Sequence, residues 1–308
     1  MSMRFHSILL SVVLAVAAAR AQQTPPARRI IDVHVHAYTH DERLGSRLTV
    51  PTTGEPVVAA RDAADHQAAT FAAMKRLNVV KAVVSGERDA ELRWKQAAPE
   101  QIIIGYNVVD PTKVDLGVLR REHAAGRLQV IGEVGAQYEG IRPNDARMEP
   151  LYSLAEELDV PIALHMHPGP PGAPYPPFGM TKMRAENGHP LVLEEVLVRH
   201  PKLRLYVMHA GWPFLDEMKA LLYEHPQVYV DLGVIAWSQP RPEFYRFLRG
   251  LVEAGYGKRI MFGSDQMVWP DRIEKTVEAI EQADFLTADQ KDDIFCNNAA
   301  RFLRLESK

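Results

Sequence analysis

Short apolar segments recur along the chain, and they predict a protein of alternating strands and helices. Each segment is rich in valine or isoleucine and has few polar positions, which is typical of strands buried on both faces of a parallel sheet. Eight such segments, each an expected strand, span residues 29–36, 79–86, 101–109, 130–135, 160–167, 203–211, 228–233 and 259–265.

Segments with apolar residues at helical spacing separate the expected strands. The clearest is residues 63–77, where alanine, phenylalanine and leucine side chains fall on one stripe of a helix. The same pattern predicts helices at residues 149–159, 191–200, 214–225 and 242–255.

This alternation predicts a (β/α)₈ barrel, the TIM-barrel fold, whose typical length is about 250 residues. A doubly wound open sheet is the alternative, but it normally has a G-x-G-x-x-G turn after the first strand. Here that turn begins HAYTHDERLG and lacks the motif. Two long connections, residues 37–61 and 168–190, follow carboxyl ends of expected strands. In a barrel those ends form the catalytic face.

The amino terminus has the features of a secretory signal peptide. Arg4 precedes a long apolar stretch, and a small-x-small triplet ends at Ala21. A membrane anchor would need a longer apolar run, so we expect no stable anchor. We therefore expect a signal peptide at residues 1–21, a flexible lead-in at residues 22–29 and one domain at residues 30–308. The mature protein is then periplasmic or secreted.

The composition is that of an ordinary globular protein, with 46% hydrophobic residues and a net charge of −3. Because the chain has no basic stretch that could follow a phosphate backbone, nucleic acid is not an expected partner. We expect a small-molecule substrate, and association into a homo-oligomer stays open. The single cysteine, Cys296, cannot form an intramolecular disulfide and is expected to be a buried thiol in a helical C-terminal segment.

Histidines and carboxylates stand at the ends of several expected strands. His34 and His36 lie two residues apart on the first strand, so their side chains share a face. Buried parallel strands should avoid such groups, because unpaired charge in a core is costly. Imidazole and carboxylate together suit Zn²⁺, and also Mn²⁺ or Fe²⁺, so we expect one or two divalent ions, with zinc favoured. The other strand-end residues are Glu133, His165, His167, His209 and Asp265.

These residues carry a resemblance to the amidohydrolase superfamily, specifically to its amidohydrolase-related group of metal-dependent hydrolases and decarboxylases. The matching pieces are DVHVH, GEVG, PIALHMH, HPKLRLYVMHAGWP, FGSD and IFCNNAARFL, spread from residue 32 to residue 302. Their order along the chain resembles that of the family at superfamily level. The group is chemically diverse, so the resemblance does not identify a substrate.

The resemblance implies metal ligands on the first and fifth strands. His34 and His36 match the first-strand pair. His165 matches the fifth-strand ligand, because its distance from Pro161 is similar to the family's P-x-x-x-H pattern. His167 shares the face of His165 and stays open as an alternative.

The resemblance also implies the roles of three further residues. His209 matches a histidine that either binds a second metal ion or polarises a carbonyl group. Asp265 matches an aspartate that is both a ligand and the general base. Glu133 stands where many relatives have a carboxylated lysine. It either bridges two ions or accepts hydrogen bonds beside a single ion.

The reaction that the resemblance implies is hydrolysis. A water molecule activated at the metal would attack a small amide, lactone or ester, with Asp265 accepting its proton and returning it to the leaving group. Non-oxidative decarboxylation of a small unsaturated or aromatic acid is the alternative. That reaction needs a cation to orient the substrate carboxylate. Lys182 and Arg184 in the second long connection are candidates, with a solvated loop position as the alternative interpretation of each.

Overall fold

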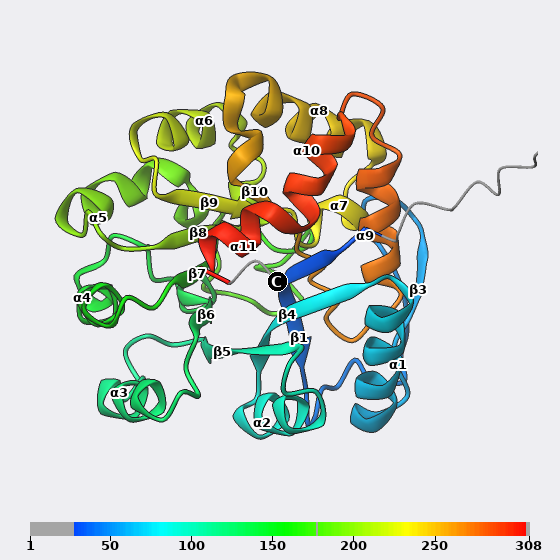
Figure 1. The fold of residues 1–308 in the computed structure, drawn as a ribbon, viewed down its shortest axis with the longest axis horizontal. Helices are drawn as coiled ribbons and strands as arrows, with labels where there is room; N and C mark the ends of the chain where they lie inside the picture. The colour runs from blue at the N-terminus through cyan, green and yellow to red at the C-terminus, as the bar shows by residue number, and fades with distance from the viewer. Residues whose placement is uncertain (1–27, 177, 306–308) are drawn as a thin grey trace, which may run out of the picture.

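A computed structural model describes residues 28–176 and 178–305 of the chain. The expected signal peptide and most of the expected lead-in, residues 1–27, lie outside the described residues. The centre of the molecule is a sheet of eight strands in the order β1-β4-β5-β6-β7-β8-β9-β10, surrounded by helices (Figure 1). The strands are β1 (Ile30–Ala37), β4 (Val79–Gly86), β5 (Ile102–Val108), β6 (Val130–Val134), β7 (Ile162–His165), β8 (Leu205–Met208), β9 (Val228–Asp231) and β10 (Ile260–Met261).

The sheet curls until its first and last strands meet. The Val33 amide donates to the Phe262 carbonyl at 3.0 Å, and the Asp265 amide donates to the His34 carbonyl at 2.8 Å. A doubly wound sheet would instead extend to both sides of its first strand, so that alternative is wrong. The seven neighbouring pairs within the sheet follow the order of the chain, and the predicted TIM barrel is confirmed.

Helices cover the outside of the barrel. Five of them overlap predicted segments: α1 (Ala63–Arg76), α4 (Glu149–Leu158), α5 (Glu194–Arg199), α6 (Leu215–Glu224) and α8 (Arg241–Leu251). In the C-terminal segment, α10 (Ala288–Asp292) and α11 (Asn298–Phe302) are helical as expected. The apolar pattern did not predict α2 (Arg88–Ala97), α3 (Leu116–Ala124), α7 (Ile235–Ser238) and α9 (Arg272–Glu281). In α2 the buried stripe is only Ala90, Glu91 and Trp94, which is too narrow to stand out in the sequence.

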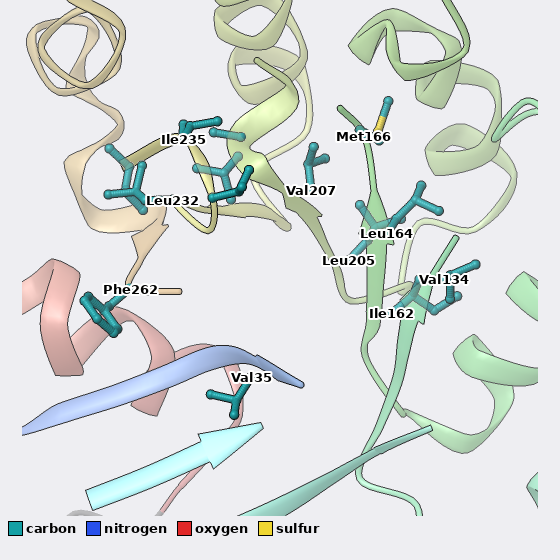
Figure 2. Close-up of a cluster of buried hydrophobic side chains, with 14 of the residues drawn as sticks. Val35, Val134, Ile162, Leu164, Met166, Leu205, Val207, Leu232, Ile235 and Phe262 are labelled. Carbon is teal, nitrogen blue, oxygen red and sulfur yellow. The ribbon is translucent and has the colours of Figure 1, made fainter. Parts of the chain in front are cut away.

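The hydrophobic core has two parts. The larger part lies between strands and helices and includes Ile162, Leu164 and Val207, all fully buried (Figure 2). The smaller part gathers side chains from strands around the whole sheet, so it fills the inside of the barrel. Phe302 of α11 belongs to this inner cluster, and α11 crosses one end of the barrel (Figure 1). The cavity described below therefore opens at the other end, at the carboxyl ends of the strands.

Both long connections lie at the open end. The first contains a two-stranded antiparallel sheet, β2 (Arg47–Thr49) and β3 (Pro56–Val58). The buried guanidinium of Arg272 at the start of α9 holds this hairpin, with Nη1 3.2 Å from Glu55 Oε1. Within residues 28–176 and 178–305, no helix has the length and apolar character needed to cross a membrane. Cys296 is a free thiol that is half-buried rather than fully buried as expected.

Candidate metal centre

One group of possible ligands joins the first and last strands. His34 and His36 come from β1, and Asp265 follows β10. Asp265 Oδ1 lies 3.1 Å from His36 Nε2 and 3.6 Å from His34 Nε2. All three side chains are buried, and their ligand atoms lie within 4.8 Å of one another. We refer to His34, His36 and Asp265 as the first metal subsite.

A second group of possible ligands includes Glu133 itself and comes from three neighbouring strands of the barrel. It consists of Glu133 from β6, His165 from the end of β7, and His209 just after β8. His165 Nδ1 lies 2.8 Å from Glu133 Oε1 and 3.1 Å from His209 Nε2. We refer to Glu133, His165 and His209 as the second metal subsite.

Glu133 connects the two subsites, because its two oxygens face different partners. Oε2 lies 3.3 Å from His36 Nε2 in the first subsite, whereas Oε1 contacts His165 in the second. This geometry supports the interpretation in which Glu133 bridges two ions. It gives less support to a glutamate that only accepts hydrogen bonds.

The structure places His165, and not His167, in this cluster. The Gly169 amide donates to His167 Nδ1 at 3.1 Å, and the ring stacks on Trp212 with centroids 5.4 Å apart. The His167 ring centroid lies 6.4 Å from that of His165. The His167 ring centroid nevertheless lies 5.1 Å from that of His209, so His165 stays the predicted fifth-strand ligand and His167 the alternative.

The Gly233 carbonyl and the Asp231 carboxylate determine which ring nitrogens of His209 and His34 face the cluster. His209 Nδ1 lies 2.9 Å from the Gly233 carbonyl, so Nδ1 carries the proton and donates it. The lone pair of His209 is then on Nε2, which points at His165. His34 Nδ1 lies 3.2 Å from Asp231 Oδ2, which likewise leaves His34 Nε2 free of its proton when the imidazole is neutral.

Asp231 was missing from the predicted residues. It ends β9, is fully buried, and its Oδ1 accepts the amides of His209 at 3.0 Å and Gly233 at 2.8 Å. Although Asp231 lies within 4.8 Å of ligand atoms of His34 and His209, its oxygens are already engaged by these donors. We therefore interpret Asp231 as orienting His34. The signal that revealed the other residues, a carboxylate at the end of an apolar run, was also present in VYVDLG.

Glycine allows the backbone to pass close to His34. A Cβ at position 233 would lie 2.5 Å from His34 Nδ1, and one at position 263 would lie 2.9 Å from His34 Cβ. Both contacts are shorter than any side chain tolerates. The glycines of VYVDLG and FGSD thus create the space in which His34 and Asp231 meet.

The charges in the cluster favour a cation. Burial alone would raise the pKa of Glu133, but the imidazoles of His165 and His34 hold it well below its ordinary value. Burial also opposes ionisation of Asp265, yet His34 and His36 hold the pKa of its carboxyl below the ordinary value. Both carboxylates are therefore ionised at neutral pH.

The residues present fit a divalent metal ion. His34 Nε2 is buried and has no hydrogen-bond partner in the described part of the chain, and it lies 3.8 Å from Glu133 Oε2, too far for a hydrogen bond. An imidazole nitrogen without a hydrogen-bond partner, buried beside two carboxylates, belongs to a ligand set suited to Zn²⁺, Mn²⁺ or Fe²⁺.

A cavity of about 320 Å³ opens directly onto the cluster. His36, Glu133 and Asp265 lie on its floor, and the walls include Tyr38, Arg43, Asn107 and Tyr138. Tyr138 and Arg43 were also missing from the predicted residues, because both lie in connections where no periodic pattern marks them. Lys182 and Arg184 do not line this cavity: Lys182 pairs with Glu139, and Arg184 donates to the carbonyls of Thr181 and Met183.

Solved structures share this fold at low sequence identity. An uncharacterized TIM-barrel protein from Bordetella bronchiseptica is 17% identical, with 90% of this chain and 98% of that chain covered and a TM-score of 0.64. A probable 2-pyrone-4,6-dicarboxylic acid hydrolase from Acinetobacter baumannii is 14% identical, with coverages of 90% and 100% and a TM-score of 0.61. A 2,6-dihydroxybenzoate decarboxylase from Rhizobium is 13% identical, with coverages of 91% and 99% and a TM-score of 0.61.

Sequence comparison identifies the family. Among curated proteins no sequence matches the chain. The profile of the amidohydrolase family matches residues 31–305, a range that contains every residue of both metal subsites. Because the match covers nearly all of the chain, the protein belongs to the amidohydrolase family.

Proposed function

We propose that the protein is a metal-dependent hydrolase that cleaves a small amide, lactone or ester. The observation that carries this proposal is the position of Asp265. Its carboxylate lies on the floor of the cavity, with Oδ1 3.1 Å from His36 Nε2 and Oδ2 3.9 Å from His209 Nδ1. A buried, ionised carboxylate that belongs to the first metal subsite and also faces the cavity is suited to accept a proton from a water molecule.

The first subsite and Glu133 Oε2 would hold one ion, and the second subsite could hold another. Such an ion, when bound, lowers the pKa of a water molecule towards about 7 and polarises a carbonyl group. Asp265 then removes the proton of the water and delivers it to the leaving group. His209 presents a lone pair at Nε2 and not a proton, so we assign it to metal binding in preference to hydrogen bonding with the substrate carbonyl.

The cavity supports a small substrate. Its volume of about 320 Å³ is at the lower end of the range of ligand pockets, roughly 300–1,000 Å³. Tyr38 and Tyr138 provide aromatic walls, so a compact ring or short chain would be enclosed near the metal cluster.

Decarboxylation is the second candidate, because the cavity wall contains a cation. Arg43 is held by Asp41, with Nε 2.9 Å from Oδ1 and Nη2 2.7 Å from Oδ2. It is the lining residue whose charge could orient a substrate carboxylate, the role considered above for Lys182 and Arg184. The pairing with Asp41 offsets much of that charge, which is why we favour hydrolysis.

A substrate panel tests the proposal. The purified protein is stripped of metal by chelation, reloaded with Zn²⁺ or Mn²⁺, and incubated with lactones, esters, amides and aromatic acids. We expect release of acid from a lactone, ester or amide, loss of this activity on chelation and recovery on reloading. Release of CO₂ from an aromatic acid without any hydrolysis would establish decarboxylation instead. Full activity after exhaustive chelation would refute the metal mechanism.

A further inference from the structure

The phenol of Tyr138 stands between two ligand atoms of the second metal subsite. Tyr138 follows β6, on the 3₁₀ turn η1 (Ala136–Glu139). Its hydroxyl donates to Glu133 Oε1 at 3.1 Å and lies 3.0 Å from His165 Nδ1. Those two ligand atoms are themselves 2.8 Å apart. The hydroxyl therefore contacts both atoms at once.

Packing holds the ring in this position. A Cβ at Gly135 would lie 2.4 Å from Tyr138 Cδ2 and 2.7 Å from Cε2, so the ring can rest here only because position 135 is glycine. On its other side the ring contacts His165, with centroids 4.5 Å apart. The sequence GEVGAQY thus places the ligand Glu133, the permissive Gly135 and the phenol of Tyr138 within six residues of one another.

The geometry makes the hydroxyl a hydrogen-bond donor. An ionised carboxylate oxygen can only accept, so Tyr138 donates its proton to Glu133 Oε1.

We propose that Tyr138 weakens the second metal subsite by donating its hydroxyl proton to Glu133 Oε1, the oxygen that a second ion needs. In the first subsite, by contrast, His34 Nε2 has no hydrogen-bond partner in the described part of the chain, and no hydroxyl group donates to its carboxylate Asp265 there. The protein then holds one ion tightly and a second ion loosely. This inference rests on the proposed function, since it requires that the two subsites bind metal.

Zinc titration of the metal-free protein tests the proposal. Zn²⁺ is added in competition with a chromophoric chelator, and the two dissociation constants are fitted for the wild type and for Tyr138→Phe. We expect the first constant to be unchanged and the second to fall by about tenfold, the change that corresponds to removing one hydrogen bond to a charged group. A second dissociation constant that is unchanged or larger in Tyr138→Phe would overturn the proposal.

Two further variants separate competition from a loss of packing. Gly135→Ala keeps the phenol but displaces its ring, so it should tighten the second ion in the same direction as Tyr138→Phe. Tyr152→Phe is the matched control, because it removes a buried hydroxyl that donates to the Pro143 carbonyl at 2.8 Å, away from both subsites. It should bind both ions as the wild type does. Failure of the wild type to bind any zinc would overturn the proposed function as well, whereas tight binding of one ion with no effect of Tyr138→Phe would overturn this inference alone.

Discussion

Replacing Asp231 with asparagine tests how a buried carboxylate controls the first metal subsite. Asparagine has the same shape, and its side-chain oxygen can still accept the amides of His209 and Gly233. The change replaces the other oxygen, which faces His34 Nδ1 at 3.2 Å, with an NH₂ group. Two hydrogen-bond donors would then face each other in a fully buried site.

The imidazole can relieve this conflict by moving its proton from Nδ1 to Nε2. That proton would then lie on the atom that faces Glu133 and Asp265, where the lone pair is needed for the metal. Changes in the partner of a metal-binding histidine typically cost about 10–100-fold in metal affinity or activity. For Asp231→Asn we therefore expect metal binding to weaken by about 1.4–2.8 kcal/mol at the first subsite.

Competitive zinc titration of the metal-free proteins measures this change. Glu91→Gln is a matched control, because Glu91 is also buried and accepts the backbone amides of Gly86 at 3.1 Å and Asn107 at 3.4 Å, yet it belongs to neither subsite. The control should bind zinc as the wild type does. An unchanged affinity in Asp231→Asn would refute the orienting role. Loss of one whole ion per chain would show that Asp231 is itself a ligand.

Three further predictions concern the bridge, the pH dependence and the location. Glu133→Gln should lower metal stoichiometry and activity severely, because a neutral amide is a poor bridge; unchanged stoichiometry with a loss of about 10–100-fold would remove Glu133 from metal contact. Burial raises the pKa of Glu91 from 4.5 to about 7, against the lowering effect of Arg88. The folded protein therefore retains this proton more readily than the unfolded chain. The free energy of unfolding should thus fall in the wild type relative to Glu91→Gln as pH rises from 4.5 to about 7, by at most about 3 kcal/mol in urea titrations. Parallel curves would contradict this. N-terminal sequencing of protein exported by its native host should begin at Gln22, and recovery of intact Met1 from the cytoplasm would contradict export.

The barrel could be predicted from the sequence because its strands are buried on both faces. Such strands need nearly continuous apolar residues, and a polar residue at a strand end then stands out against that background. The same reasoning would have found Asp231, which ends β9 just as Asp265 follows β10. The helical pattern would likewise have found α9, because Ile273, Thr276 and Ile280 fall on its buried stripe at helical spacing.

Residues in the connections could not be predicted in the same way. The position of Tyr138 depends on a 3₁₀ turn and on the space above Gly135, and that of Arg43 on its pairing with Asp41. Neither dependence produces a periodic pattern, because loops follow the packing of distant parts of the chain. The same difficulty applies to Lys182 and Arg184, which the sequence offered either as carboxylate-binding candidates or as solvated loop residues, and which do not line the cavity.

Charge alone does not decide how many ions this centre holds. Glu133, Asp231 and Asp265 are buried carboxylates within a few ångströms of the histidine ligands. With one divalent cation, the three carboxylates and the ion together carry a small net negative charge. With a second cation, the net charge becomes positive and of the same size. The buried site therefore tolerates either number about equally on electrostatic grounds. The hydrogen bonds around the ligand atoms break this balance, because His34 Nε2 is unpartnered in the described structure whereas Glu133 Oε1 already accepts the Tyr138 hydroxyl. Competition at that oxygen, and not the number of carboxylates, is thus the variable that should separate one ion from two.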